Sequence, residues 1–496
     1  MKGIIDYLER TAAAFPDKTA VACGEKTYSF RELMIVSRRI GAEIRKSCGS
    51  NEPVAVMVNR SADTVCAFFG AVYNGCFYVP VDPSMPKDKI KAVLKDSDTR
   101  IVLGSGSNKQ VIEEIGFSGS YVDLDHIGLN EIDPPDISDD TPLYMIYTSG
   151  STGKPKGVLK SHGAVKSFIE AYTKTFDLSE REIIGNQTPL FFDASAKDIY
   201  QMLFTGATLE IIPSEYFMLP TALIQYLNQK RISYICWVPT ALSMVVQMKA
   251  FRKQLPETLR SVFFVGEVFP SKQLRAWTEA LPEVRFVNLY GSSEIAGICA
   301  YYEIDRDNIP DVLPLGRALS NCEVFLSDGV GFIETPGEIG EMMIAGDALA
   351  MCYFNDPDKT SERFISMVTP SGVKKRVFRS GDLARYNENG DIVFASRSDF
   401  QIKHLGKRIE LGEIEAAADR LPFIQRCCCI YDADLQLIKL FCELIPESEE
   451  TGVSIRKALR PMLSDYMLPQ RVIVLESMPF NANGKINRTL LSEIKV

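Results

Sequence analysis

The sequence predicts an α/β fold in which a large N-terminal domain of mainly parallel sheets flanked by helices, with a small β subdomain, is followed by a small α+β C-terminal domain. Apolar runs such as PVAVMV, SVFFVG, RFVNLY and EMMIAG alternate with amphipathic stretches such as ADTVCAFFGAVYNG and KDKIKAVLKDSD. Buried strands that alternate with helices are typical of parallel sheets. At 496 residues, 46% of them hydrophobic, the chain is long enough to build several cores.

The elements become shorter after about residue 400. IELGEIEAAADRL, CCCIYDA, LIKLFCELI and SIRKALRPML predict short helices and strands. The turn-forming residues of NENG and SRSD cluster just before this change. We therefore expect two domains, residues 1–398 and 399–496, with the boundary at Asp399.

Composition excludes several classes of protein. A net charge of −9 without a run of basic residues gives no footprint for nucleic acid. Neither a signal peptide nor an apolar stretch of about 18 residues is present, which predicts a cytoplasmic protein that does not enter membranes. The twelve cysteines include no CxxC pair and the three histidines have no metal-ligand spacing, so we expect no zinc site. Cys427 to Cys429 are expected on a buried strand.

The stretch YTSGSTGKPKGV, from Tyr147 to Val158, combines glycines, hydroxyl side chains and lysines. Glycines let several backbone N–H groups turn inward together, hydroxyls add donors, and lysines neutralise negative charge. The spacing is not that of the Walker A loop, because only two residues separate Gly150 from Gly153 and Lys154 is followed by Pro155. We therefore expect a phosphate-binding loop of another kind.

This stretch resembles the phosphate loop of the adenylate-forming superfamily, which includes nonribosomal peptide adenylation domains and acyl-CoA synthetases. Other motifs of that family follow in its usual order along essentially the whole chain. They are KTYSFREL, CFYVPVDPSMP, FFDASAKDIY, NLYGSSE, GEIGEMMIAGDALAMCYFN, FRSGDLARY, SRSDFQIKHLGKRIELGEIE and NANGKINR.

The resemblance implies an AMP-forming ligase that uses ATP and Mg²⁺. An amino acid is converted to aminoacyl-AMP with release of pyrophosphate and is then passed to the phosphopantetheine thiol of a carrier protein. Because no carrier domain follows LLSEIKV, we expect that carrier to be a separate protein. FVGEVFP and WVPT are similar to D-alanine:carrier-protein ligases, so that activity stays open. An acyl-CoA synthetase and a nucleotide-binding scaffold without catalysis stay open as well.

Roles for the nucleotide-binding residues come from the same resemblance. Tyr290 is expected to stack on adenine beside Ser293, Asp382 to receive the ribose hydroxyls, and Arg397 to contact the nucleotide. The catalytic set is Glu294, Lys156 and Lys485. Glu294 would hold Mg²⁺, and Lys485 would bridge the substrate carboxylate and the α-phosphate. The β- and γ-phosphates would be held by Thr148, Ser149, Gly150, Ser151, Thr152, Gly153 and Lys156.

The C-terminal domain is expected to be a mobile lid that rotates about a hinge at Asp399 after adenylation. Gly406 would then border the thiol tunnel. KHLGKR replaces the more usual KIRGxR around this glycine, so the neighbours of Gly406 depart from the pattern of the family.

Asp193 interrupts an apolar run, and a carboxylate there needs a cation. The resemblance implies that this cation is the α-ammonium group of an amino acid, although Asp193 could instead cap the helix that follows. Lys197 could bind an acidic side chain of the substrate or neutralise Asp193 four residues earlier. A small or medium neutral amino acid is the leading expectation for the substrate, and an acidic one stays open. The substrate pocket is predicted to contain Asp193, Ala194, Lys197, Trp237, Phe263, Val265, Leu289, Gly297 and Ile298.

Overall fold

The computed structural model describes residues 3–148, 155–397, 401–433, 435–446, 448–480 and 486–494. By their internal contacts they form two compact units. The large unit comprises residues 1–83, 93–147 and 157–398, and the small unit comprises residues 84–92, 148–156 and 399–496. The predicted boundary at Asp399 falls outside the described residues, as does the hinge assigned to it, so both stay predictions.

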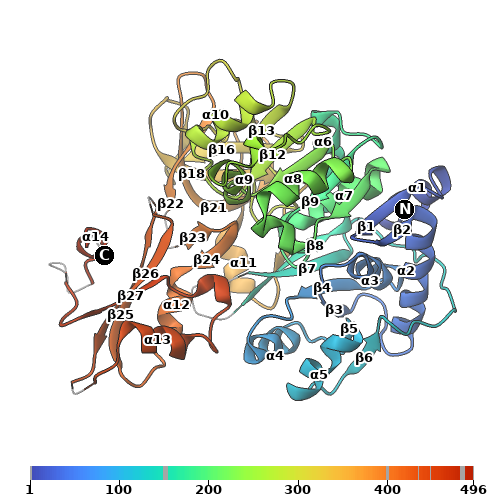
Figure 1. Cartoon of the computed structure of the whole chain (residues 1–496), viewed down its shortest axis with the longest axis horizontal. Coiled ribbons are helices and arrows are strands. Elements are labelled where there is room, and N and C mark those ends of the chain that lie inside the picture. The colour runs from blue at the N-terminus through green and yellow to red at the C-terminus, as the bar shows by residue number, and fades with distance from the viewer. Residues whose placement is uncertain are drawn as a thin grey trace. The chain divides into compact units, whose positions relative to one another are not determined.

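A nine-stranded sheet runs through the large unit (Figure 1). Its central strands are parallel, and β2, β14 and β15 pair antiparallel at its two ends. In spatial order the strands are β15 (Arg317–Ala318), β14 (Ala300–Glu303), β13 (Arg285–Tyr290), β12 (Ser261–Val265), β11 (Tyr234–Trp237), β9 (Ile183–Asn186), β10 (Thr208–Ile211), β1 (Thr19–Cys23) and β2 (Lys26–Ser29).

A second, seven-stranded sheet has a parallel centre, with the antiparallel strand β19 at one edge. Its order is β19 (Cys352–Tyr353), β8 (Lys156–Ser161), β7 (Pro142–Thr148), β4 (Phe77–Val81), β3 (Pro53–Met57), β5 (Ile101–Gly104) and β6 (Ser120–Asp123). Strands buried on both faces read as continuous apolar runs, as in β3 and β4.

Helices connect and cover these two sheets, and their starts follow local rules. Ser29 and Ser61 accept backbone N–H groups at the starts of α2 and α3, which pack on each other. The helices are α1 (Ile5–Ala14), α2 (Phe30–Arg45), α3 (Ala62–Tyr73), α4 (Lys87–Asp96), α5 (Gly106–Glu114), α6 (His162–Phe176), α7 (Ala196–Thr205), α8 (Pro220–Gln229), α9 (Pro239–Gln247), α10 (Ser271–Ala280) and α11 (Pro357–Arg363). Within the described ranges, no helix has both the length and the apolar character needed to cross a bilayer.

A third sheet of the large unit is antiparallel and forms the predicted β subdomain. Its order is β17 (Phe332–Ile333), β16 (Cys322–Ser327), β18 (Gly340–Gly346), β21 (Lys374–Tyr386) and β20 (Phe364–Val368), and β22 (Ile392–Arg397) pairs with β21. The long strand β21 carries the whole FRSGDLARY motif.

The small unit is α+β. A hairpin and a three-stranded sheet are accompanied by short helices, and Cys427 to Cys429 are buried on β25 as predicted. The elements are β23 (Gln401–His404), β24 (Lys407–Glu410), α12 (Leu411–Ala418), β25 (Ile424–Asp432), β26 (Leu437–Leu444), α13 (Gly452–Leu459), β27 (Arg471–Leu475) and α14 (Arg488–Ser492). The α/β class predicted from the alternating apolar runs is therefore confirmed.

Candidate active site

Most of the predicted site residues of the large unit follow or end strands of the nine-stranded sheet. Asp193 comes after β9, Val265 ends β12, and Tyr290 ends β13 with Glu294 four residues beyond. These three strands are parallel within one sheet, so their carboxyl ends lie at the same edge. Ligands of open α/β sheets bind at that edge, which makes it the candidate active site.

Three residues predicted to bind the nucleotide meet at one carboxylate. Arg397 donates from Nη1 to Oδ1 of Asp382 at 2.6 Å, and the Tyr290 hydroxyl donates to Oδ2. Burial and the neighbouring Asp382 carboxylate raise the pKa of Tyr290, so its hydroxyl stays protonated and available as a donor. Ser293 is half-buried in the turn that follows Tyr290. The arrangement presents a charged acceptor beside an aromatic ring, which suits a ribose and its base.

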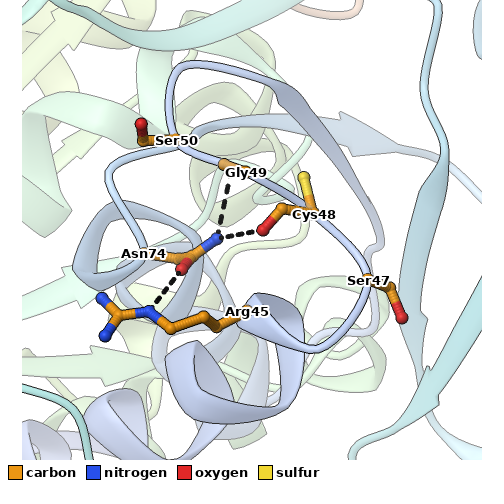
Figure 2. A pocket seen from close by; sticks show the side chains of 6 residues that line it. All are labelled: Arg45, Ser47, Cys48, Gly49, Ser50 and Asn74. Atoms are coloured by element: carbon orange, nitrogen blue, oxygen red, sulfur yellow. Dashed lines mark hydrogen bonds between the residues drawn. The ribbon is translucent and has the colours of Figure 1, made fainter.

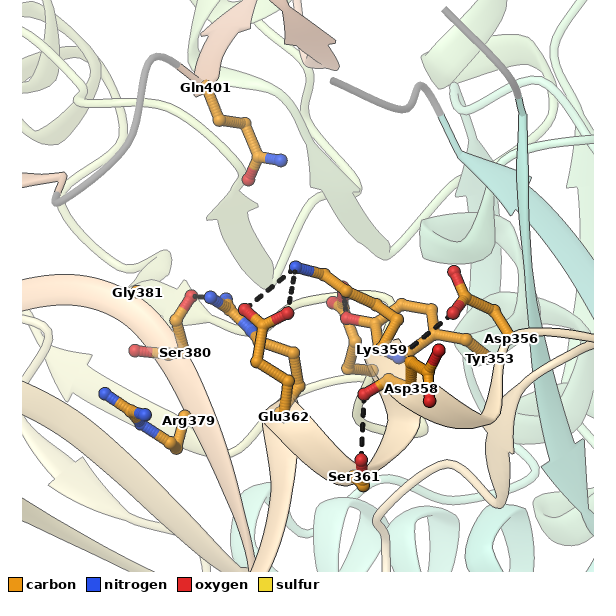
Figure 3. Close-up of polar contacts among 12 residues, drawn as sticks. Tyr353, Asp356, Asp358, Lys359, Ser361, Glu362, Arg379, Ser380, Gly381 and Gln401 are labelled. Atoms are coloured by element: carbon orange, nitrogen blue, oxygen red, sulfur yellow. Dashed lines mark hydrogen bonds and ion pairs between the residues drawn. The ribbon is translucent and has the colours of Figure 1, made fainter. Parts of the chain in front are cut away.

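Asp382 is held in place through the turn that precedes it on β21. Ser380 accepts the backbone N–H of Asp382 at 3.0 Å and donates its own hydroxyl to the Met342 carbonyl at 2.6 Å. Figure 3 shows Ser380 and Gly381 beside α11, where Asp356 caps the helix by accepting the N–H of Lys359 at 3.0 Å. The serine found in place of the more usual threonine therefore keeps the hydroxyl that this turn uses.

Glu294 is fully buried, which is unusual for a carboxylate and requires polar partners. Tyr353 on β19 donates from its hydroxyl to Oε1 of Glu294 at 2.8 Å. Sequence reasoning missed Tyr353, although it lies in the motif GDALAMCYFN. A fixed carboxylate oxygen is a ligand of the kind that Mg²⁺ prefers, so Glu294 fits the predicted metal role.

Asp193 lies close to a lysine that sequence reasoning missed. Lys160 on β8 is fully buried and its Nζ lies 2.5 Å from Oδ1 of Asp193. Tyr144 donates to the same oxygen at 3.0 Å. The sequence did contain a signal for this pair, because Lys160 lies inside the apolar strand run GVLKS. A charged side chain flanked by buried residues needs a partner. Asp193 does not cap the next helix, since α7 starts at Ala196 after a short 3₁₀ turn.

The pairing of Asp193 with Lys197 is corrected by the structure. Lys197 is buried and its Nζ lies 2.5 Å from Oδ1 of Asp198, while Asn186 donates to Oδ2 of Asp198 at 2.9 Å. The nearby Asp198 carboxylate raises the pKa of Lys197 against the opposing effect of burial. The charge of Lys197 is thus neutralised by Asp198, so this lysine is not available to an acidic side chain of the substrate.

The assignment of Trp237 to the pocket is wrong, because successive residues of a strand face opposite sides of the sheet. Trp237 packs in the core that contains Val262 and Phe264, and its indole donates to the Gly185 carbonyl at 2.8 Å. Its neighbour Cys236 faces the other core together with Phe263. Cys236 therefore takes the place predicted for Trp237.

The other predicted pocket residues lie on or beside that same face. Phe263 is fully buried among aromatic rings, and its ring centroid lies 4.7 Å from that of Phe176. Gly297 has φ of +110°, and a Cβ there would meet the ring of Phe168. Four further members are half-buried or buried beside them: Ala194, Val265, Leu289 and Ile298.

The phosphate loop is described only at its two ends. Thr148 is the last residue of β7 and Lys156 is the first residue of β8. Ser149, Gly150, Ser151, Thr152 and Gly153 lie outside the described residues, as does Lys485. In the small unit, Gly406 with φ of +73° and Leu405 with φ of +51° form the two-residue turn between β23 and β24.

A surface pocket lies elsewhere in the large unit, between the end of α2 and the end of α3. Asn74 donates to the carbonyls of Cys48 and Gly49 at 3.2 and 3.3 Å and accepts from Nε of Arg45 at 3.3 Å (Figure 2). Ser47 and Ser50 complete its lining. These bonds hold the loop between α2 and β3, and none of the family motifs contributes to the lining.

Comparisons with known proteins identify the family of this chain. Residues 8–354 match the family model described as "AMP-binding enzyme". The chain is 30% identical over 99% of its length to tyrocidine synthase 1 of Brevibacillus parabrevis, of whose length it spans only 45%.

Two solved structures share the fold. Against o-succinylbenzoate CoA synthetase (MenE) of Bacillus subtilis the TM-score is 0.87 with 20% identity, over 99% of this chain and 98% of the other. PA1221 is a nonribosomal peptide synthetase protein that contains adenylation and PCP domains. Against PA1221 the TM-score is 0.85 with 21% identity, over 99% of this chain and 84% of the other. The chain belongs to the AMP-binding enzyme family and is an AMP-forming ligase related to nonribosomal peptide synthetase adenylation domains.

Proposed function

We propose that this ligase joins a carboxylic acid to AMP and then transfers the acyl group to a phosphopantetheine thiol. A carboxylate oxygen attacks the α-phosphorus of ATP, the bond from that phosphorus to the bridging oxygen breaks, and pyrophosphate leaves. The carboxylate of the resulting acyl-AMP is no longer charged, and AMP is the leaving group when the thiol attacks the carbonyl carbon. The observation that carries the proposal is the convergence of Tyr290 and Arg397 on Asp382.

Each group has a physical task in this reaction. The Asp382 carboxylate accepts the ribose hydroxyls and thereby fixes the position of the α-phosphate. Glu294, oriented by Tyr353, would hold Mg²⁺, which when bound neutralises charge on the phosphate oxygens. Lys156 and the loop residues Ser149 to Gly153 are proposed to bind the terminal phosphates. Lys485 is proposed to stabilise the charge that develops as the anhydride forms.

Exchange of labelled pyrophosphate into ATP tests the first half-reaction. The purified protein should catalyse exchange that requires both an added carboxylic acid and Mg²⁺ and that stops on chelation. Lys485→Ala should lose adenylation while its circular dichroism spectrum stays that of the wild type. Acid-dependent exchange at the wild-type rate in Lys485→Ala would remove that residue from the mechanism.

The proposed acceptor of the second half-reaction is a phosphopantetheine thiol on a separate carrier protein. Coenzyme A ends in the same thiol arm, so the two acceptors must be compared directly. Mass spectrometry of holo-carrier proteins and of coenzyme A, each incubated with enzyme, ATP and the activated acid, separates them. Loading of coenzyme A with no loading of any carrier protein would move the enzyme to the acyl-CoA synthetases.

The resemblance of the motif around Asp193 supports an amino acid as the acid, and FVGEVFP supports D-alanine as one candidate. Recognition of an amino acid at this motif requires a carboxylate that can receive an ammonium group. In the structure Oδ1 of Asp193 already receives Lys160. Whether the activated acid is an α-amino acid therefore depends on the role of Lys160.

A further inference from the structure

Lys160 has the surroundings that an ammonium ligand would need. Its Nζ donates to Oδ1 of Asp193 at 2.5 Å and to the backbone carbonyl of Ile295 at 3.0 Å, and it lies 5.2 Å from the centroid of the Tyr144 ring. A carboxylate, a carbonyl and an aromatic face are the groups by which proteins bind ammonium ions. The site for an ammonium group is therefore present, and a side chain of the protein occupies it.

Two buried carboxylates lie near this lysine. Asp193 and Glu294 are two carboxylates within one buried cluster, and each acts electrostatically on Lys160. Burial lowers the pKa of Lys160, whereas both carboxylates favour its charged form. One ammonium group beside Asp193 neutralises that residue and leaves Glu294 as the remaining negative charge. In an enzyme without Lys160, the ammonium group would have to come from the substrate.

A second ammonium group at Asp193 would be unfavourable. Two positive charges held a few ångströms apart repel each other, and burial weakens the screening of that repulsion by water. The open oxygen of Asp193, Oδ2, has no hydrogen-bond partner within the described part of the chain. It can accept a neutral hydroxyl from a ligand, and that interaction does not add a positive charge beside Lys160.

We propose that Lys160 takes the place of the substrate ammonium group, so that the acid activated by this enzyme has no charged amino group on its α-carbon. The acid would carry hydrogen, a hydroxyl or a carbonyl oxygen at that position. This inference rests on the proposed adenylation and names its substrate class. It makes Lys160 a residue that determines specificity, beside the residues that bind the nucleotide.

Matched sets of acids test the inference. Each set keeps one side chain, such as methyl, isobutyl or benzyl, and varies the α-substituent among D- and L-ammonium, hydroxyl, carbonyl oxygen and hydrogen. Acid-dependent pyrophosphate exchange by the wild type should be at least tenfold faster, as kcat/KM, for an acid without the ammonium group. A tenfold preference for the α-amino acid, D-alanine included, would overturn the inference and leave the adenylation intact. If no acid gave exchange, the proposed adenylation would itself fail, and the inference with it.

Variants at the pair give a second test. Lys160→Met keeps the length of the side chain and removes its charge, so selectivity should shift toward α-amino acids by tenfold or more. The double variant Lys160→Met with Asp193→Asn removes both charges and should keep the wild-type preference for acids without an α-ammonium group. It can be measured even if the single variant, with an unpaired buried carboxylate, does not fold. Lys166→Met is the matched control, because Lys166 pairs with Asp139 at 2.7 Å outside the site. Unchanged selectivity in a folded Lys160→Met would contradict the proposal.

Discussion

Arg397 lies 2.6 Å from Asp382, and the two residues are partners in the register of β21 and β22. The pair is mostly buried, with 14% and 6% of the side chains exposed. An arginine and a carboxylate at that depth are stable only because each satisfies the other. The same geometry fixes the position of the carboxylate that we propose as the acceptor of the ribose hydroxyls.

Replacing Asp382 with Asn should weaken the use of ATP. Hydrogen bonds to a charged acceptor contribute about 1.5 to 3 kcal/mol each, so kcat/KM for ATP should fall about 10- to 100-fold. The measurement is pyrophosphate exchange at varied ATP. Tyr290→Phe is the control that keeps the carboxylate and should have a smaller effect. Equal kcat/KM for ATP in Asp382→Asn and the wild type would exclude Asp382 as the ribose acceptor.

Removing the hydroxyl of Tyr353 should change the Mg²⁺ requirement. Tyr353→Phe leaves Glu294 without the donor that orients Oε1, so we expect the Mg²⁺ concentration for half-maximal exchange to rise about three- to tenfold. Tyr301→Phe is a matched control, since its hydroxyl accepts only from the exposed Arg317. A Mg²⁺ titration of Tyr353→Phe identical to that of the wild type would show that the Tyr353 hydroxyl does not contribute to Mg²⁺ binding.

His162 should make the protein less stable in mild acid. The ring is fully buried and its Nδ1 accepts the backbone N–H of Ile4 at 3.0 Å. Burial lowers the pKa of His162 to about 3, below the ordinary value of about 6.5. Between these values the unfolded chain binds a proton that the folded chain does not. The free energy of unfolding should therefore fall as the pH falls below about 6.5, by about 2 kcal/mol at about pH 5.

Urea unfolding at several pH values measures this dependence. His162→Asn keeps an acceptor near the position of Nδ1 and cannot titrate, so its stability should vary less with pH over this range. His126→Asn is a control at the surface, because the side chain of His126 is 81% exposed. A pH dependence in His162→Asn as steep as that of the wild type would assign the acid sensitivity to other groups.

Asn74 should contribute to stability through the loop in Figure 2. It is buried and donates to the carbonyls of Cys48 and Gly49, and the bond to Cys48 is buried. The Gly49 carbonyl also accepts from the Cys76 thiol, so Asn74→Ala mainly removes the partner of the Cys48 carbonyl. Leaving that buried acceptor unsatisfied should reduce the free energy of unfolding by about 1 to 3 kcal/mol. Chemical denaturation measures the change, and Asn228→Ala, at a mostly exposed loop contact, is the comparison. An equal loss in both variants would mean that burial does not amplify the effect at Asn74.

The sequence by itself determined where strands alternate with helices. It also showed which candidate site residues follow those strands. Parallel strands buried on both faces must be apolar throughout, so β3 and β4 are visible as uninterrupted runs. The family motifs likewise carry the residues proposed to bind nucleotide, because the chemistry of phosphate and ribose restricts the types and spacing of such residues.

Tertiary structure alone decided which residues face each other. A one-residue error in register moves a side chain to the opposite face of a sheet, which is why sequence spacing puts Trp237 in the pocket in place of Cys236. The partners of Asp193 and Lys197 were equally hidden. Spacing along the chain places Lys197 four residues from Asp193, but the 3₁₀ turn before α7 and the strand β8 bring Lys160 to Asp193 instead. Buried charges find partners in space, and those partners need not be neighbours in sequence.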